Sequence, residues 1–318
     1  MKNFALTGVA GYIAPRHLKA IADTGNKLIA AVDPHDSVGI IDRYFSDVSY
    51  FSEFERFDRH LEKLRRKGEA ERMHYLTVCS PNHLHDSHIR LGLRLGADVI
   101  SEKPLVLNPW NVESLEELEK ETGKKVYTIL QLRVHPSLIE LKKKIKAQKS
   151  DKKYNVCLSY ITSRGPWYHY SWKGNINKSG GVATNIGVHF FDLLIWLFGD
   201  VKENIVHLSK ADKVSGYLEL ENANVSWYLS IDKNDLPKKA VEVGQPTYRS
   251  ITIDGEEIEF SHGFTDLHTR VYEETINGNG FGIADAKPAI QTVYDIRNSE
   301  ITSQLDNLHP FNKELIKG

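Results

Sequence analysis

The sequence predicts a doubly wound α/β domain followed by an α+β domain with a mainly antiparallel sheet. Short apolar strands alternate with helical segments across residues 3–135, which is the order that a parallel sheet requires. From Tyr154 the strand-like runs follow one another without helices between them, which favours antiparallel pairing. The 318 residues suffice for about two domains, and we place the boundary between residues 135 and 136.

Composition restricts the class of protein. A formal net charge of −1 gives no global attraction to nucleic acid or to an anionic membrane. No apolar run approaches the roughly 18 residues of a membrane span, and residues 1–8 are too short and strand-like for a signal peptide. Cys79 and Cys157 lie in apolar runs and are expected to be small buried hydrophobes. We therefore expect a protein of the reducing cytoplasm with no membrane, nucleic-acid or metal partner.

The first strand, residues 4–7, runs into a glycine-containing turn that opens a helix. The turn reads G-x-x-G-x-x-A from Gly8 to Ala14. Glycine lets the backbone approach a pyrophosphate, and the helix N-terminus favours its negative charge. The pattern is one step looser than G-x-G-x-x-G, so an ordinary strand-to-helix turn is the alternative.

The second strand, residues 27–32, ends in Asp33. This residue follows Gly11 by 22 positions, close to the roughly 20 expected for the acid that binds the adenosine ribose. A carboxylate here accepts hydrogen bonds from the ribose hydroxyls and repels a 2′-phosphate, so NAD is favoured over NADP. A turn or capping role before Pro34 is the alternative.

Two further strands end in polar residues. The strand at residues 73–79 precedes Ser80, Asn82 and His85, which either contact a cofactor or only cap the next helix. The next strand, residues 98–100, precedes Ser101-Glu102-Lys103-Pro104, in which the proline ends the strand. A lysine at such a strand end lies where open α/β sheets bind ligands, and it can hold a hydroxyl or take its proton. A surface lysine is the alternative.

The second half carries one more stretch with chemical content, from Ser179 to Asp192, which continues as an apolar helix to Gly199. Asn185, His189 and Asp192 stand at i, i+4 and i+7, hence on one helix face. A polar stripe on an apolar helix is either hydrogen-bonded or functional. Other elements are expected as strands near 204–208, 214–220, 224–231 and 249–253, a long loop over 232–247, and helices over 265–277 and 285–298.

Taken together, three motifs resemble the glucose–fructose oxidoreductase/inositol dehydrogenase/MocA family of nicotinamide-dependent sugar dehydrogenases. They are the turn at residues 8–14, Glu102-Lys103-Pro104, and G-G-x-x-x-N-x-G-x-H-x-x-D at residues 180–192. The resemblance implies an NAD-binding Rossmann domain over residues 1–135. It also implies an α+β substrate-binding and oligomerisation domain over 136–318, whose large open sheet covers the nicotinamide. Where the family usually has an aspartate the chain has Asn185, so acid–base work falls on Lys103 and His189.

Asn185 and four shorter segments resemble one subgroup, the bacterial enzymes that oxidise C3 of UDP-N-acetylglucosaminuronic acid. The segments are residues 131–136, 165–168, 171–174 and 234–237. In that subgroup the 3-keto product is transaminated to a diamino-uronic acid of the lipopolysaccharide O-antigen. The resemblance implies a homotetramer, and NADH that is reoxidised by a 2-oxo acid such as 2-oxoglutarate.

The resemblance also assigns site residues. Lys103 and His189 are the catalytic candidates, and which of them is the base stays open. The expected cofactor contacts are Ala10, Gly11, Tyr12, Ile13, Asp33, Ser80, Asn82, His85, Glu102, Lys103, Gln131, Trp172 and Lys173. The expected substrate contacts are Lys103, Arg133, Arg164, Asn185 and His189. Arg164 is favoured for the uronate carboxylate because a guanidinium binds it with two parallel hydrogen bonds, and a surface ion pair is its alternative.

Two other functions stay open from the sequence. One is a dehydrogenase of the same family that acts on a free sugar or cyclitol, which would not need to hold a nucleotide diphosphate. The other is a non-catalytic NAD(H)-binding sensor, which Asn185 keeps open and the presence of both Lys103 and His189 argues against.

Overall fold

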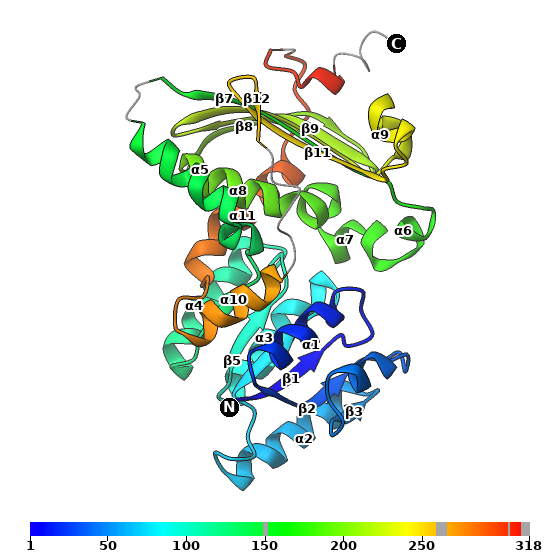
Figure 1. The fold of residues 1–318 in the computed structure, drawn as a ribbon, viewed down its shortest axis with the longest axis vertical. Helices are drawn as coiled ribbons and strands as arrows, with labels where there is room; N and C mark the ends of the chain where they lie inside the picture. The colour runs from blue at the N-terminus through cyan, green and yellow to red at the C-terminus, as the bar shows by residue number, and fades with distance from the viewer. Residues whose placement is uncertain (149–151, 259–265, 305, 313–318) are drawn as a thin grey trace. The chain divides into compact units, whose positions relative to one another are not determined.

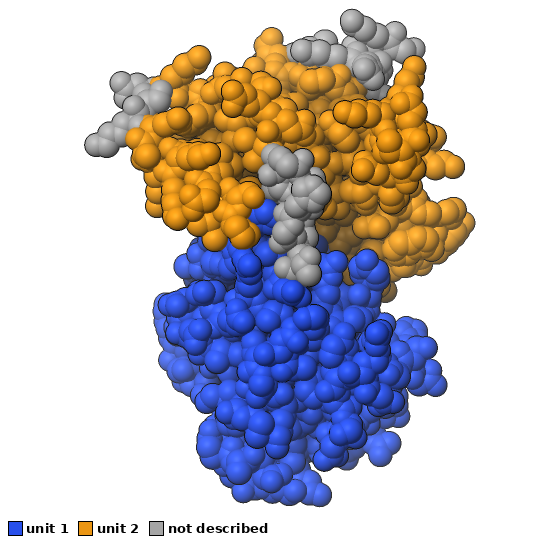
Figure 2. Space-filling model, viewed as in Figure 1, with its two compact units in different colours: residues 1–135, 264–287 blue, residues 136–263, 288–318 orange. Residues whose placement is uncertain are grey.

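A computed structural model describes residues 1–148, 152–258, 266–304 and 306–312. The chain forms two compact units, shown in Figure 2. Unit 1 contains residues 1–135 and 264–287, and unit 2 contains residues 136–263 and 288–318. The chain thus returns to unit 1 through a segment that the sequence prediction assigned to the second domain.

Unit 1 is built on a six-stranded sheet in the order β3-β2-β1-β4-β5-β6. All neighbouring pairs run parallel, so the predicted doubly wound α/β fold is confirmed. The sequence prediction missed β3, which has only three partly buried residues. The strands are β1 (Asn3–Thr7), β2 (Lys27–Val32), β3 (Ser49–Phe51), β4 (Tyr75–Val78), β5 (Asp98–Ser101) and β6 (Val126–Thr128).

The helices of unit 1 follow the strands as the alternating pattern predicts. They are α1 (Ala14–Asp23), α2 (Phe54–Lys67), α3 (His85–Arg94), α4 (Pro109–Thr122) and α10 (Leu267–Ile276), with 3₁₀ turns at Gly39–Arg43, Asn82–Leu84 and Gln131–Val134. Helix α4 starts at Pro109, whose missing N–H costs nothing in a first turn, and ends at Gly123 in the left-handed conformation.

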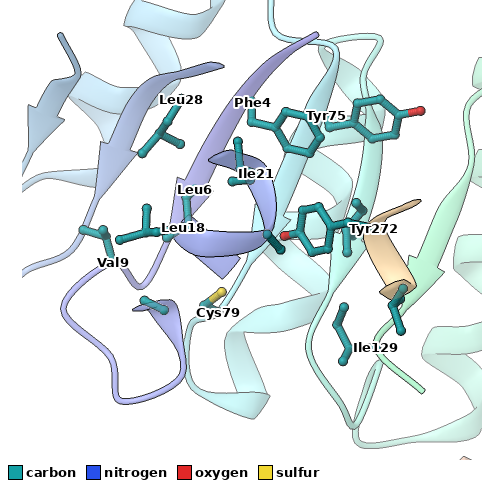
Figure 3. Close-up of a cluster of buried hydrophobic side chains, with 14 of the residues drawn as sticks. Phe4, Leu6, Val9, Leu18, Ile21, Leu28, Tyr75, Cys79, Ile129 and Tyr272 are labelled. Atoms are coloured by element: carbon teal, nitrogen blue, oxygen red, sulfur yellow. The ribbon is translucent and has the colours of Figure 1, made fainter. Parts of the chain in front are cut away.

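Helix α10 completes the core of unit 1. Leu267, Val271 and Tyr272 are buried in the same apolar cluster as Leu6 and Leu18, as Figure 3 shows for three of these five side chains. The helix predicted over residues 265–277 is present as Leu267–Ile276, and Thr265 lies outside the described residues. Burial of several large side chains at about 1.5–3 kcal/mol each holds this late segment on the first sheet.

Unit 2 has a mixed, mostly antiparallel sheet in the order β12-β11-β7-β10-β9-β8. The predicted α+β class is confirmed, with one parallel pair between β7 and β10. Two tight connections join β8, β9 and β10 as a meander, and β10 is thereby laid beside β7 in the same direction. The strands are β7 (Tyr154–Thr162), β8 (Val201–Ser209), β9 (Lys213–Leu220), β10 (Ala223–Ser230), β11 (Thr247–Ile253) and β12 (Glu256–Glu257).

Helices α5 and α8 lie along one face of this sheet (Figure 1), and Lys142 of α5 stacks over the Trp196 ring of α8. The expected loop over 232–247 contains a 3₁₀ turn, Lys233–Asp235, and a short helix, α9. The helices and helical turns of this unit are α5 (Pro136–Ala147), α6 (Trp167–Tyr170), Trp172–Gly174, α7 (Ile176–Ser179), a π-helix at Ala183–Gly187, α8 (Val188–Phe198), α9 (Lys238–Glu242) and α11 (Ile283–Asn298) from residue 288 on, its first five residues belonging to unit 1.

The expectation about apolar runs was wrong for one segment. Among the described residues, Ile176–Phe198 is long and apolar enough to cross a membrane, with a mean hydropathy of 1.5 in its most apolar window. Of that window, 83 % is buried inside the protein. The segment therefore belongs to the core of unit 2. A helix that is hydrophobic on all sides is buried either in a membrane or in the core of a protein, and here the protein buries it.

Candidate active site

The turn after β1 brings three strand ends into close contact. Gly8 has a φ of +80°, and a Cβ built there would lie 2.6 Å from the carbonyl carbon of Cys79. Its amide donates a 2.8 Å hydrogen bond to the carbonyl of Val32. The left-handed conformation and the close approach both require glycine. They fix the turn at the point where the strand order reverses, which is where such sheets bind ligands.

Asp33 is buried at the end of β2 and holds the same turn. Its Oδ2 accepts the amide N–H of Ala10 at 3.0 Å, and its Oδ1 accepts that of His35 at 2.9 Å. An ionised carboxylate accepts about four hydrogen bonds, so capacity is left for two ribose hydroxyls. Helix α1 has no side-chain cap, and the amides of Tyr12 and Ile13 just before it form no hydrogen bond within the described chain, so they can meet a pyrophosphate. This arrangement fits a bound dinucleotide.

His85 and Ser80 tie the loops after β4 and β5 together. The ring nitrogens of His85 lie 2.7 Å from the carbonyl oxygen of Pro104 and 2.8 Å from that of Ser80. Burial lowers the pKa of His85, although the hydrogen bonds to these carbonyls oppose the shift. The Ser80 hydroxyl pairs with His88, whose pKa burial lowers to about 4. The side chain of His85 thus supports the loops, and a cofactor contact by it stays a prediction, as does one by the buried Asn82.

Glu102 and Lys103 follow β5 directly. The Glu102 side chain is buried, and its Oε2 accepts the main-chain N–H of Lys103 at 3.1 Å. Its Oε1 lies 3.0 Å from Nε2 of His17 and 3.2 Å from Nε2 of His268. The carboxylate is therefore engaged by groups of unit 1, and a cofactor contact by Glu102 stays a prediction.

These two histidine partners of Glu102 were not predicted from the sequence. His17 lies on α1 and His268 on α10, and Nδ1 of His17 is 2.9 Å from the Tyr272 hydroxyl, which is 2.9 Å from that of Thr77. Of these residues, only His17 carries a sequence pattern that indicates a buried polar contact. It stands among Ala14, Leu18 and Ile21 at the spacing of a buried helix face, where a histidine needs a polar partner.

Gln131 and Arg133 stand on the 3₁₀ turn after β6. The guanidinium of Arg133 donates to Oδ1 of Asp285 at 2.7 Å and to the Asp285 carbonyl at 3.0 Å. It also lies over the Phe281 ring, 5.6 Å from the centroid. These contacts join the segment after α10 to the strand ends, and a substrate contact by Arg133 stays a prediction.

Asn185 and His189 belong to unit 2. Asn185 is buried in the π-helix, and its Nδ2 donates to the Tyr168 hydroxyl at 2.7 Å. His189 is half-buried in the first turn of α8. A Cβ at Gly187 would lie 2.5 Å from Leu229 of β10, so the glycine sets how closely this helix start approaches the sheet. π-helical turns are frequent at functional sites because they re-aim side chains.

Arg164 and Lys173 provide positive charge in the segment between β7 and α7. The ammonium of Lys173 lies 4.8 Å from the centroid of the Trp172 ring and 5.5 Å from that of Trp167. Burial lowers the pKa of Lys173, and the nearby Arg164 charge lowers it further. Neither cation forms an ion pair with a carboxylate of the described residues. Two such cations favour a bound anion.

The predicted residues thus fall into two sets. Those of unit 1 gather at the carboxyl ends of its parallel strands: Ala10, Gly11, Tyr12, Ile13, Asp33, Ser80, Asn82, His85, Glu102, Lys103, Gln131 and Arg133. Those of unit 2 lie between β7 and the start of α8: Arg164, Trp172, Lys173, Asn185 and His189. Lys103 and His189 therefore come from different units, and their joint action stays a prediction.

Comparison with known proteins identifies both units. Residues 2–130 match an oxidoreductase family with an NAD-binding Rossmann fold, and residues 142–236 match the C-terminal alpha/beta domain of the same family. Crystal structures of the WlbA (WbpB) dehydrogenase from Thermus thermophilus are similar over 98 % of this chain and 100 % of that one, with a TM-score of 0.94. Identity is 52 % to its complex with NAD and α-ketoglutarate and 51 % to its complex with NAD and UDP-GlcNAcA.

More distant relatives share the fold. The WlbA dehydrogenase of Bordetella pertussis, in complex with NADH and UDP-GlcNAcA, is 21 % identical with a TM-score of 0.75, over 93 % of this chain and 94 % of that one. Inositol 2-dehydrogenase of Rhizobium meliloti is 24 % identical over 62 % of this chain and 55 % of its own length. The matched part spans about half the length of such curated relatives. With both characteristic domains present in order, the chain belongs to the GFO/IDH/MocA family of NAD-binding oxidoreductases.

Proposed function

We propose that the protein oxidises the C3 hydroxyl of UDP-N-acetylglucosaminuronic acid to the 3-keto sugar with NAD. The observation that carries this proposal is the 52 % identity, over nearly the whole chain, to a dehydrogenase crystallised with NAD and, in a second structure, with UDP-GlcNAcA. The presence of both Lys103 and His189 supports catalysis over a sensor role. We place the enzyme in the cytoplasm as a homotetramer, supplying a 3-keto sugar for transamination to a diamino-uronic acid of the lipopolysaccharide O-antigen.

The turn after β1 and Asp33 hold the cofactor in this proposal. The amides of Tyr12 and Ile13, just before α1, bind the pyrophosphate, and the buried carboxylate of Asp33 accepts hydrogen bonds from the adenosine ribose. Bound NAD supplies the acceptor for the hydride that leaves C3 of the sugar. Asp33 also selects against NADP, because its charge repels a 2′-phosphate.

Lys103 and His189 handle the proton of the same hydroxyl. Oxidation of an alcohol to a ketone releases one hydride and one proton, and the proton passes from the hydroxyl oxygen to one member of this pair. Asn185 cannot take it, because an amide has no basic nitrogen. The other member of the pair holds the oxygen by a hydrogen bond and keeps C3 in line for the transfer.

Arg164 and Lys173 provide the anion recognition that a nucleotide sugar acid requires. Arg164 binds the uronate carboxylate through two parallel hydrogen bonds. Lys173 and Trp172 contact the cofactor, while Arg133 and Asn185 contact the substrate. The anion-binding roles are supported by the charges of Arg164 and Lys173, which lie near one another and have no carboxylate partner in the described chain.

Reduced cofactor is recycled in this proposal by 2-oxoglutarate. The Thermus thermophilus relative has been crystallised with NAD and α-ketoglutarate, the same oxo acid. Reduction of the 2-oxo group to a hydroxyl takes up one hydride and one proton, the reverse of the sugar step. Lys103 or His189 then returns the proton, so one site serves both half-reactions.

The test is nicotinamide absorbance of the purified protein with NAD and UDP-N-acetylglucosaminuronic acid, with and without 2-oxoglutarate. NADH formation, or turnover that depends on the oxo acid, is expected. If neither occurs while NAD stays bound, the proposal fails, and free sugars and cyclitols are assayed next. Thermal stabilisation by UDP separates these cases, since a ligand that binds only the native state raises its stability.

A further inference from the structure

We propose that Glu102 is a positioning residue, which fixes the main chain of Lys103 by joining it to histidines on helices α1 and α10. The inference rests on the proposed function through the role of Lys103 in handling the proton. It assigns a positioning role to Glu102 of the Glu102-Lys103-Pro104 motif and to two histidines outside the motifs, His17 and His268.

Both oxygens of the Glu102 carboxylate are engaged. Oε2 accepts the N–H of Lys103 at 3.1 Å, while Oε1 accepts hydrogen bonds from His17 at 3.0 Å and His268 at 3.2 Å. The amide of Glu102 itself donates to the Val78 carbonyl at 2.9 Å, which holds this residue to β4. The carboxylate therefore connects the backbone of the catalytic lysine to two helices that are distant in the sequence.

Neighbouring groups select the protonation state that the network needs. Burial lowers the pKa of His17 against the opposing hydrogen bond to Glu102, so its ring is neutral and carries one proton. The Tyr272 hydroxyl donates to Nδ1 of His17 when it accepts in turn from Thr77, and the ring proton then lies on Nε2, facing Glu102. Burial raises the pKa of Glu102, but hydrogen bonds from the two histidines outweigh it and keep the carboxylate ionised.

The ionised form matters because it can accept hydrogen bonds on both sides at once. A glutamine at this position has one oxygen and one amide NH₂. Its NH₂ group would therefore face another donor, either the N–H of Lys103 or the histidines. The mismatch moves the main chain of Lys103 away from its place. A displacement of about 1 Å at a catalytic group can cost about 100-fold in rate.

The same three side chains could in principle ligate a metal, since their donor atoms lie within 4.8 Å of one another. The structure favours the hydrogen-bonded network. Nδ1 of His17 and both oxygens of Glu102 already have partners at ordinary hydrogen-bond distances, and the site is buried. A metal would have to replace those bonds, and this occupant is an outcome of the test.

The experiment compares Glu102→Gln with Glu116→Gln, the same chemical change at a partly exposed ion pair with Lys287 in unit 1. We expect Glu102→Gln to lower kcat about 10- to 100-fold with KM for both substrates within about threefold. We also expect faster hydrogen exchange at the amide of Lys103. Glu116→Gln should match the wild type in both measurements.

Substitutions of His268 separate positioning from packing. His268→Gln keeps an N–H that can reach Glu102 and should retain most of the kcat, whereas His268→Leu fills similar space without a donor and should resemble Glu102→Gln. Equal activity of the two variants would contradict the proposal. Nitrogen-15 NMR of the imidazoles should show His17 neutral, with its proton on Nε2.

Other outcomes overturn the inference directly. They are an unchanged kcat and unchanged Lys103 exchange in folded Glu102→Gln, or a stoichiometric divalent metal that is lost from this variant. Failure of the proposed function is distinguishable, because an inactive wild type leaves the exchange and NMR measurements unaffected. If the wild type is active and Glu102→Gln is equally active, only the positioning role of Glu102 is refuted and the proposed function stands.

Discussion

Replacing Gly8 by alanine tests whether the nucleotide turn is held by close backbone contact. The φ of +80° costs an L-residue about 1–2 kcal/mol. The added Cβ would also lie 2.6 Å from the backbone of Cys79 and 2.7 Å from the amide of Ser80, and backbone cannot swing aside. Overpacking of this kind costs about 1–3 kcal/mol. We therefore expect a loss of about 2–5 kcal/mol in the free energy of unfolding.

Gly25→Ala is the matched control. Gly25 has a similar φ of +70° at the far end of α1, but nothing lies within 4 Å of a Cβ there. It carries only the conformational cost, about 1–2 kcal/mol. The difference between the variants therefore isolates the contact between the ends of β1 and β4.

The assay is urea unfolding monitored for each variant, followed by thermal unfolding with and without NAD. Gly8→Ala should be about 1–3 kcal/mol less stable than Gly25→Ala. NAD should stabilise Gly25→Ala as it does the wild type, by about 2.7 kcal/mol at 100 times the Kd, and Gly8→Ala much less. Equal stability of the two variants, or equal stabilisation by NAD, would refute the reasoning.

Three further outcomes are expected. Lys213→Met should lower the free energy of unfolding in urea by about 3–5 kcal/mol, because it removes the buried ammonium that lies 2.6 Å from Asp235. Lys202→Met is the control and should leave the stability unchanged, because the ion pair that it removes, with Glu221, is exposed. Burial lowers the pKa of His309 to about 3, so only the unfolded state takes up its proton between pH 6.5 and 3; stability should fall as pH drops through that window, and less steeply in His309→Gln. Asp33→Ser should weaken NAD binding and raise the NADP-to-NAD affinity ratio at least about tenfold by calorimetry.

Each of these three predictions has a result that would contradict it. Comparable losses in the Lys213 and Lys202 variants would mean that burial does not set the cost of removing a partner. An identical pH slope with and without His309 would remove this residue as a source of the acid sensitivity. An unchanged cofactor ratio would show that the Asp33 carboxylate does not face the ribose.

The strands of unit 1 could be predicted because each carries its signal locally. β2 and β4 are mostly apolar and buried, as strands of a parallel sheet are, and a polar residue follows within two positions of the end of each. β3 has only three partly buried residues and no such run. In unit 2, the direction of β10 beside β7 depends on how two tight connections place it, which no window of sequence contains.

The same division between local and long-range information applies to the site. Gly8 and Asp33 belong to a motif with fixed spacing, so sequence alone could name them. Glu102 could be named but not understood, because its partners are 85 and 166 residues away in the chain. His268 becomes a partner only because α10 returns to the first sheet, which the apolar residues of that helix do not reveal by themselves.

A buried polar residue on an apolar helix face is the one feature of the local sequence that indicates such a distant partner. His17 stands at a core position of α1, where an unpaired imidazole would cost free energy. The position therefore implies an acceptor somewhere else in the fold, and Glu102 is a candidate because it is an acid next to a strand end. The core position of His17 thus makes its pairing with Glu102 a testable requirement of the fold, independent of any assumption about the substrate.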